Sequence, residues 1–136
     1  MEIALIAHSG KKELLAQFCI AYYTILKNHH LCAPAATAQY VADAAGLEIE
    51  RYMLSEFGGD QQIASKISCN EIDCLIYFRE TSEYKAPDRD SSDLLRLCDI
   101  RCIPFATNLA TAEILIRAIE VGDLDWREYE NPVGRP

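Results

Sequence analysis

The sequence predicts one α/β domain, residues 1–136, built on a parallel five-stranded sheet flanked by helices. Two observations lead to this fold class. Short apolar segments alternate along the chain with segments of helical length, and 136 residues are enough for one compact domain but not for two. Strands that alternate with helices pair in parallel through right-handed crossovers. The carboxyl ends of the strands should therefore meet at one edge of the sheet.

Five segments are predicted to be strands. The run EIALIA, residues 2–7, is apolar without strict alternation, which is typical of a strand buried on both faces. IDCLIYF, residues 72–78, gives the strongest strand signal of the chain. Three shorter segments complete the predicted sheet: 30–33, the weaker LEIERYM from Leu47, and IPFAT at 103–107.

The helices are predicted from apolar residues at helical spacing and from glycine at helix ends. The predicted helices are 11–28, 37–45 ending at Gly46, a helix that begins just after Gly59, a helix marked by Leu94, Leu95 and Leu97, and 110–121. The polar tail DLDWREYENPVGRP is expected along the surface or against a neighbouring subunit.

Composition excludes several classes of function. A net charge of −8 and a pI near 4.8 argue against a nucleic-acid partner, because no basic face would neutralise phosphates. No apolar run is long enough to span a membrane, and no signal-peptide order is present. The six cysteines form no CxxC pair and lie among core-type neighbours, so we expect reduced thiols in a cytoplasmic protein and no zinc site.

Ligands in open parallel sheets bind at the carboxyl ends of the strands. That rule brings together His8-Ser9-Gly10 and the segments 33–37, 55–60 and 79–90. The third segment overlaps FGGDQQ, residues 57–62, where Gly58 and Gly59 let the backbone approach a ligand closely and Asp60 opens a helix. An acid at a helix start is by itself most often a cap. Its position at this edge makes Asp60 a candidate for chemistry.

Four motifs resemble the methylglyoxal synthase family: ALIAH at 4–8, GGDQQI at 58–63, LLRLCD at 94–99 and IPFATNLATAE at 103–113. They occur in the family's order through nearly the whole chain, as does DLDWRE near the end. The resemblance implies a Rossmann-like homohexamer that converts dihydroxyacetone phosphate to methylglyoxal and phosphate, with neither a metal nor an organic cofactor. The same fold is an allosteric ligand-binding domain in carbamoyl-phosphate synthetase, so fold alone leaves the activity open.

The resemblance also implies roles for particular residues. Asp60 matches the base that removes a proton next to the substrate carbonyl, and the resulting enediolate expels phosphate. His8 and Asp90 match further catalytic positions. Residues expected to hold the phosphate of this small anionic metabolite are Lys12, Thr37, Ser55 and Gly59.

Several residues depart from the family pattern, among them Ser9, which replaces an aspartate. Pro34, which has no N–H, opens the segment 34–38 that aligns with the family's Thr-Gly-Thr-Thr-Gly loop. Glu56 adds a negative charge near the phosphate, and Pro87 aligns with a histidine that polarises the carbonyl. Two lost hydroxyl donors and one lost electrophilic donor amount to about 6–10 kcal/mol, or about four to seven powers of ten in rate.

Three functions therefore stay open at this point. The chain is a weak methylglyoxal synthase, a related enzyme for another small carbonyl compound, or a binding and regulatory module that has lost the chemistry. The retained Asp60 favours an enzyme, because a module that only binds needs no base.

Overall fold

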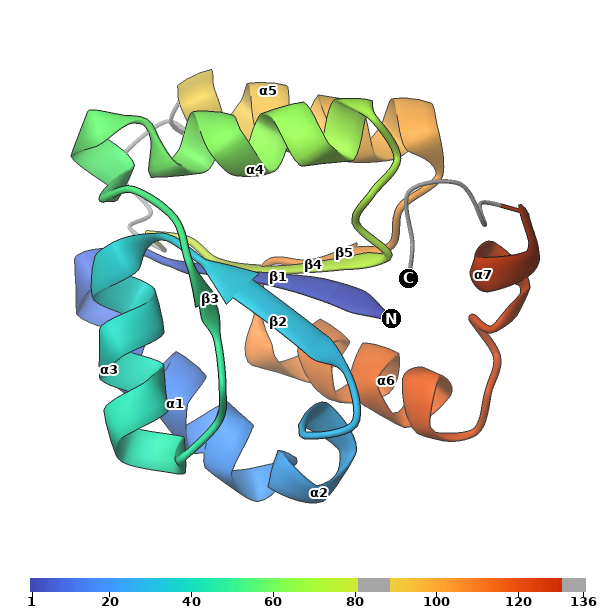
Figure 1. Cartoon of the computed structure of the whole chain (residues 1–136), viewed down its shortest axis with the longest axis horizontal. Helices are drawn as coiled ribbons and strands as arrows, with labels where there is room; N and C mark the ends of the chain where they lie inside the picture. The colour runs from blue at the N-terminus through green and yellow to red at the C-terminus, as the bar shows by residue number, and fades with distance from the viewer. Residues whose placement is uncertain (81–88, 131–136) are drawn as a thin grey trace.

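A five-stranded sheet with every strand parallel runs through the middle of the molecule (Figure 1), as the sequence predicts. The computed structural model describes residues 1–80 and 89–130. The strand order is β3-β2-β1-β4-β5. The strands are β1 (Glu2–Ala7), β2 (His30–Ala33), β3 (Glu50–Arg51), β4 (Cys74–Phe78) and β5 (Phe105–Ala106).

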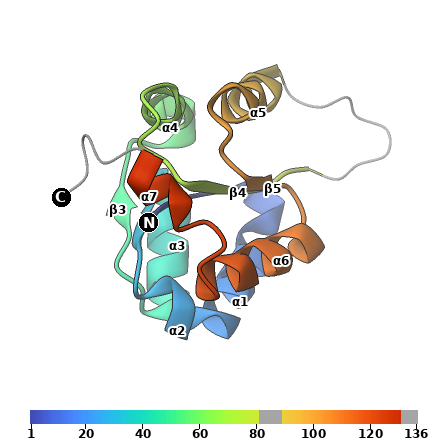
Figure 2. The ribbon, with the colours of Figure 1, turned by 90° about the vertical axis from the view of Figure 1, so that its right-hand side faces the viewer.

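Helices cover both faces of the sheet. Figures 1 and 2 show α4 and α5 on one face, and α1, α2, α3 and α6 on the other. The α-helices are α1 (Lys12–Ala21), α2 (Tyr23–Leu26), α3 (Ala35–Ala45), α4 (Gly59–Ser68), α5 (Arg89–Arg101), α6 (Leu109–Glu120) and α7 (Trp126–Glu130). Two short 3₁₀ helices, η1 (Ser9–Lys11) and η2 (Ser55–Phe57), precede α1 and α4.

β1 forms the centre of the core, which explains why all of its residues after Glu2 are apolar. Ile3 pairs with Leu31 of β2 on one side and with Cys74 of β4 on the other. Ile3 and its alternate neighbours pack with α1, α3 and α6, whereas Ala4 and Ile6 pack with α4 and α5. Both faces of the strand are thus buried, so no polar residue is needed on either.

The segment 11–28, predicted as one helix, is divided into α1 and α2 at Tyr22. Tyr22 leaves the helical conformation, with φ −109° and ψ 26°. Its ring lies 5.0 Å from that of Phe18, between centroids, and the guanidinium of Arg117 lies 5.9 Å from the ring. The break therefore occurs where Tyr22 connects α1 to α6.

The C-terminal segment is anchored by a buried arginine, which the prediction of a surface tail did not foresee. Arg127 of α7 is 3% exposed and its Nε lies 3.3 Å from the carboxylate of Asp73, which is 0% exposed. Other N–H groups of Arg127 donate to Asn70 Oδ1 at 2.8 Å and to the carbonyl oxygen of Cys102 at 2.6 Å. Asp73 also accepts the backbone N–H of Glu2 at 2.9 Å. The guanidinium of Arg127 thus connects α7 to the residues just before β4 and β5, and Asp73 extends the connection to the first residue of β1.

The cysteines are unpaired thiols in two settings. Burial raises the pKa of four of them to about 12: Cys19, Cys32, Cys74 and Cys98. Cys69 and Cys102 are exposed, so the prediction that every cysteine lies in the core is wrong for these two. Both follow the last turn of a helix, where the chain returns to the surface. Among the described residues, no helix has the length and apolar character needed to cross a membrane.

Candidate active site

The order in which the chain adds strands to the sheet reverses between β1 and β4. The chain leaves β1 towards β2 and leaves β4 towards β5, so a crevice is expected beyond the carboxyl ends of these two neighbours. His8 directly follows β1, and its N–H donates to the carbonyl of Phe78, the last residue of β4, at 2.9 Å. The starts of α1, α3, α4 and α5 lie at the same edge (Figure 1). This is the edge at which the sequence places the site.

His8 is held by contacts on both ring nitrogens. Nδ1 accepts a hydrogen bond from the backbone N–H of Gly10 at 3.3 Å, so the neutral ring carries its proton on Nε2. Nε2 lies 3.5 Å from the carboxylate of Glu80, and both side chains are almost half exposed. His8 can therefore turn its Nε2–H towards a bound molecule. Glu80 was not predicted as a site residue. Its position two residues after β4, at the carboxyl ends of the strands, could have indicated that it lies near the site.

Asp60 lies in the first turn of α4. Gly58 precedes that helix with φ 107°, a conformation that residues with a side chain rarely adopt. Ser55, for which phosphate binding stays a prediction, donates its hydroxyl hydrogen to Asp60 Oδ1 at 2.8 Å. Ser55 and Asp60 thus form one unit, in which the hydroxyl orients the carboxylate.

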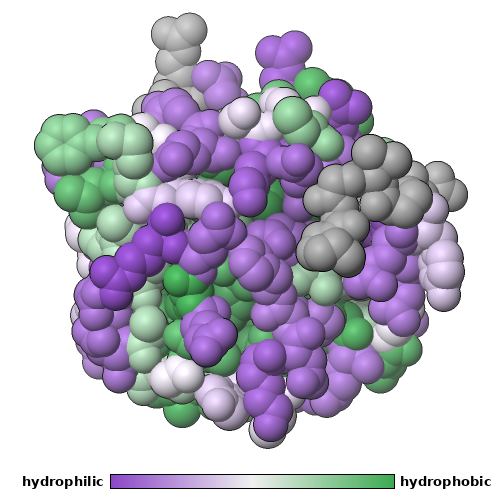
Figure 3. Space-filling view, viewed as in Figure 1, coloured by the Kyte–Doolittle hydropathy of each residue, from purple (hydrophilic) through white to green (hydrophobic). Residues whose placement is uncertain are grey.

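Two large apolar side chains in the segment that leads into α4 are exposed. Met53 is 53% exposed and Phe57 is 65% exposed. Figure 3 shows apolar surface over the region where α4 begins in Figure 1. Such side chains reduce the access of water to a carboxylate once a ligand covers them.

Gly59 is required by close packing between the starts of α3 and α4. A Cβ on Gly59 would lie 2.0 Å from the carbonyl oxygen of Met53 and 3.1 Å from Cβ of Pro34. The carbonyl of Met53 also accepts the N–H of Ala35, at 3.2 Å. The missing side chain therefore sets the position of Asp60 relative to the first turn of α3.

We expect Gly59→Ala to destabilise the protein by about 1–3 kcal/mol, the usual cost of overpacking a well-packed site. The backbone of Met53 must move to accept the methyl group, and Asp60 must shift with it. Gly10→Ala is the matched control at the same edge, because its Cβ would meet no atom closer than 3.7 Å. Urea unfolding of both variants measures the difference. Equal stability of Gly59→Ala and wild type would contradict the packing argument.

The segment 34–38 is a helix start, not a loop as the alignment with the family suggested. Pro34 precedes α3, Ala35 N–H donates to Met53, and Ala38 N–H donates to the carbonyl of Pro34 at 2.8 Å. α3 begins two residues earlier than predicted, because proline suits a helix start and alanine is the best helix former. The amides of Ala36 and Thr37 lie in the first turn, where an α-helix offers its N–H groups no internal acceptor.

The remaining predicted residues are placed less directly. Thr37 is 2% exposed, so its hydroxyl reaches only a ligand seated directly on the first turn of α3. Lys12 is the first residue of α1 and partly exposed. Asp90 lies in the first turn of α5, while its side chain and all of Pro87 fall outside the described residues.

The electrostatics of this edge favour a small anion held by backbone groups. α1, α3 and α4 all begin here, and the N-terminus of a helix carries about half a positive charge. Lys11 and Lys12 add positive charge, and the exposed Glu56 and Glu80 oppose it. Among the described residues, the group with metal-ligand spacing lies at the other edge of the sheet, at Glu2.

The fold is that of a parallel α/β protein whose binding edge lies at the carboxyl ends of its strands. The sequence model of the MGS-like domain family matches residues 15–107. The chain is 51% identical over 132 residues to the methylglyoxal synthase of Caldicellulosiruptor saccharolyticus, with 97% of this chain and 94% of that one covered. It is 45% identical over 128 residues to the methylglyoxal synthase of Bacillus subtilis, covering 94% and 93%.

A solved structure agrees. The crystal structure of methylglyoxal synthase from Elizabethkingia anophelis NUHP1 superposes with a TM-score of 0.78 at 34% identity, covering 85% of this chain and 76% of that one. The chain belongs to the methylglyoxal synthase family. Relatives under this one name match nearly the whole chain, so they support a lyase and do not favour a non-catalytic or altered-substrate module.

Proposed function

We propose that this protein is a carbon–oxygen lyase that converts dihydroxyacetone phosphate to methylglyoxal and inorganic phosphate. The observation that carries the proposal is Asp60, which is partly exposed in the first turn of α4 and is hydrogen-bonded by Ser55 at 2.8 Å. Family membership supports the same reaction. A product assay with Asp60→Asn as the blank tests it.

In the proposed reaction, Asp60 takes a proton from the hydroxymethyl carbon next to the carbonyl, so that phosphate is on the carbon at the other side. The electron pair of that C–H bond moves to form an enediolate, and the C–O bond to phosphate then breaks. Phosphate leaves with the pair of that bond, and the remaining enol becomes methylglyoxal after protonation on carbon. The hydroxyl of Ser55 holds one oxygen of Asp60 in place and so orients the carboxylate.

We assign polarisation of the carbonyl to His8, because Pro87 stands where the family has its histidine. Because Nδ1 accepts the hydrogen bond from Gly10, Nε2–H is the donor assigned to the enediolate oxygen. Asp90 stays a candidate for the catalytic set through its place at the start of α5.

Phosphate binding is proposed to depend on backbone amides more than on hydroxyl groups. Ala36 and Thr37 supply N–H groups at the start of α3, and Lys12 and Gly59 lie at the starts of the neighbouring helices. Exposed Glu56 opposes a dianion. We therefore expect weaker phosphate binding and slower turnover than in the Bacillus subtilis relative measured side by side. Equal values for the two proteins would contradict this account of residues 34–38.

Restoring one donor and removing the opposing charge should tighten phosphate binding. We expect Ala36→Thr with Glu56→Gln to lower the Kd for inorganic phosphate by about tenfold or more, since a hydrogen bond to a charged group contributes about 1.5–3 kcal/mol. Ala44→Thr is the matched control, because it makes the same change on an exposed position in the last turn of α3. Calorimetric titration measures all three proteins. An equal gain in the control would mean that the hydroxyl acts through helix stability instead.

We propose a homohexamer in the cytoplasm, as the resemblance implies. Large apolar side chains are exposed on several elements, with Ile100 61%, Ile114 68% and Val121 69% exposed, as expected for surfaces that subunits cover. The buried thiols, kept protonated by their raised pKa, suit a reducing compartment. Light scattering at micromolar concentration should give about six times the chain mass, and a sharp monomer mass would contradict the assembly.

A further inference from the structure

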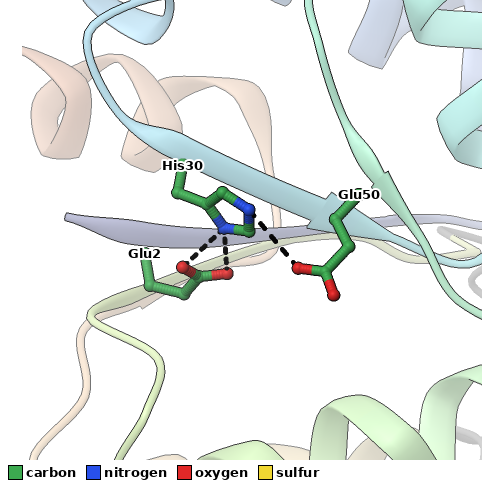
Figure 4. A group of neighbouring side chains, drawn as sticks. All are labelled: Glu2, His30 and Glu50. Atoms are coloured by element: carbon green, nitrogen blue, oxygen red, sulfur yellow. Dashed lines mark hydrogen bonds and ion pairs between the residues drawn. The ribbon is translucent and has the colours of Figure 1, made fainter. Parts of the chain in front are cut away.

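Three side chains with metal-ligating atoms meet at the edge of the sheet opposite the candidate active site (Figure 4). Glu2, His30 and Glu50 stand at the starts of β1, β2 and β3, three neighbours in the sheet. His30 Nδ1 lies 2.6 Å from the carboxylate of Glu2, and Nε2 lies 3.4 Å from that of Glu50. Parallel pairing brings the three side chains together. Glu2 pairs with His30, and Glu50 pairs with Cys32, which is two residues after His30 and therefore on the same face of the sheet.

The three side chains are open to solvent on one side and meet a buried polar atom on the other. His30 is 54% exposed, Glu50 42% and Glu2 19%. His30 and Glu50 also line a cavity of about 480 Å³. Beside them, the hydroxyl of Tyr52 is buried against the Cys32 thiol and has no hydrogen bond of ordinary geometry. A buried hydroxyl without a good partner is uncommon in proteins and is commonly satisfied by water or an ion.

We propose that Glu2, His30 and Glu50 bind a divalent transition metal of the zinc type, with water completing its coordination. One imidazole nitrogen and two carboxylate oxygens are donors that Zn²⁺ accepts, and three protein ligands plus water is a frequent zinc arrangement. The site is separate from the reaction proposed above, which involves no metal. It would fasten the starts of three strands together.

The spacing fits such an ion after small side-chain rotations. One ligand atom from each residue lies within 4.8 Å of the other two. Ligands at about 2.0–2.2 Å from zinc are about 3.3–3.6 Å apart in a tetrahedron. The glutamates are partly exposed, so they can rotate by about the remaining ångström. The two carboxylates give the group a negative charge, and the net charge of −8 attracts dications to the whole chain.

Lys66 is the neighbour that weakens the site. Its Nζ lies 3.9 Å from the carboxylate of Glu50 and 5.2 Å from the centre of the Tyr52 ring. A metal ion at Glu50 therefore competes with an ammonium group. Removing that group should strengthen metal binding, whereas a merely structural triad would bind no metal in either background.

The test is a calorimetric titration of the full chain with ZnCl₂ after the exposed thiols of Cys69 and Cys102 have been alkylated. We expect one Zn²⁺ per chain, a Kd at least tenfold weaker in His30→Ala and in Glu50→Gln, and a severalfold tighter Kd in Lys66→Met. Glu48→Gln is the matched control, since it removes the same charge two residues from Glu50 and lies outside the triad. Its Kd should equal that of wild type.

Two outcomes overturn the proposal. The first is that wild type takes up no Zn²⁺ at tenfold molar excess. The second is that Glu50→Gln and Glu48→Gln bind it as well as wild type, which would place the ion elsewhere. Because Glu50 is an exposed side chain at the end of the row, Glu50→Gln keeps the test decisive even if His30→Ala does not fold.

Discussion

Asp60→Asn should lower kcat/KM for methylglyoxal formation by about two to four powers of ten, the usual contribution of a general base. The amide cannot take the proton from carbon. Its oxygen can still accept the hydrogen bond from Ser55, at 2.8 Å in the wild-type protein, so the start of α4 should keep its shape. Phosphate affinity should therefore hold or rise, because a negative charge has left the site.

The control for this change is Asp99→Asn, which removes an exposed carboxylate in the last turn of α5, away from the candidate site. Its kcat/KM should equal that of wild type. Steady-state kinetics with calorimetric phosphate binding separates loss of chemistry from loss of binding. An Asp60→Asn enzyme that keeps more than about a tenth of wild-type activity would assign the proton transfer to another group.

Arg127→Met should lower the free energy of unfolding by about 3–5 kcal/mol, because breaking a buried ion pair leaves the other charge uncompensated. Asp73, which is 0% exposed, would lose its cationic partner. Asn70 and the carbonyl of Cys102 would lose hydrogen-bond donors at 2.8 and 2.6 Å. These last two residues have positive φ angles, 56° and 53°, which the contacts with Arg127 help to maintain.

Arg101→Met removes an exposed arginine at the end of α5 and should change stability by no more than about 0.5 kcal/mol. Urea unfolding measures both variants, and equal m-values validate the comparison. Asp73→Asn combined with Arg127→Met should cost less than the sum of the two single changes, because the residues share one interaction. A loss below about 1 kcal/mol for Arg127→Met would show that the network contributes little to stability.

Most of the fold follows from local sequence patterns. EIALIA gave β1 with the predicted bounds, because a strand buried on both faces needs no alternation. Gly46 ends α3 with φ 71°, as glycine after an apolar repeat predicts. The strand predicted at 72–78 begins at Cys74, and Asp73 just before it is bound to Arg127, 54 residues away in the sequence. No local pattern reports a contact of that range.

Motifs also led to the residues of the candidate site. FGGDQQ located Asp60, and the carboxyl-edge rule placed His8 beside the same crevice. The bond between Ser55 and Asp60 and the contact between His8 and Glu80 depend on side-chain directions that a motif does not specify. The need for glycine at position 59 came from the backbone of Met53, which only the three-dimensional packing reveals.

The central claim, that this chain eliminates phosphate from dihydroxyacetone phosphate through Asp60, is tested most directly by following both products at once. Purified wild-type protein is incubated with dihydroxyacetone phosphate, and methylglyoxal and inorganic phosphate are measured over time, with Asp60→Asn at equal concentration as the blank for spontaneous breakdown. We predict that wild type forms the two products in a one-to-one ratio, at a rate clearly above that blank. Equal rates for wild type and Asp60→Asn, or phosphate release without methylglyoxal, would contradict it.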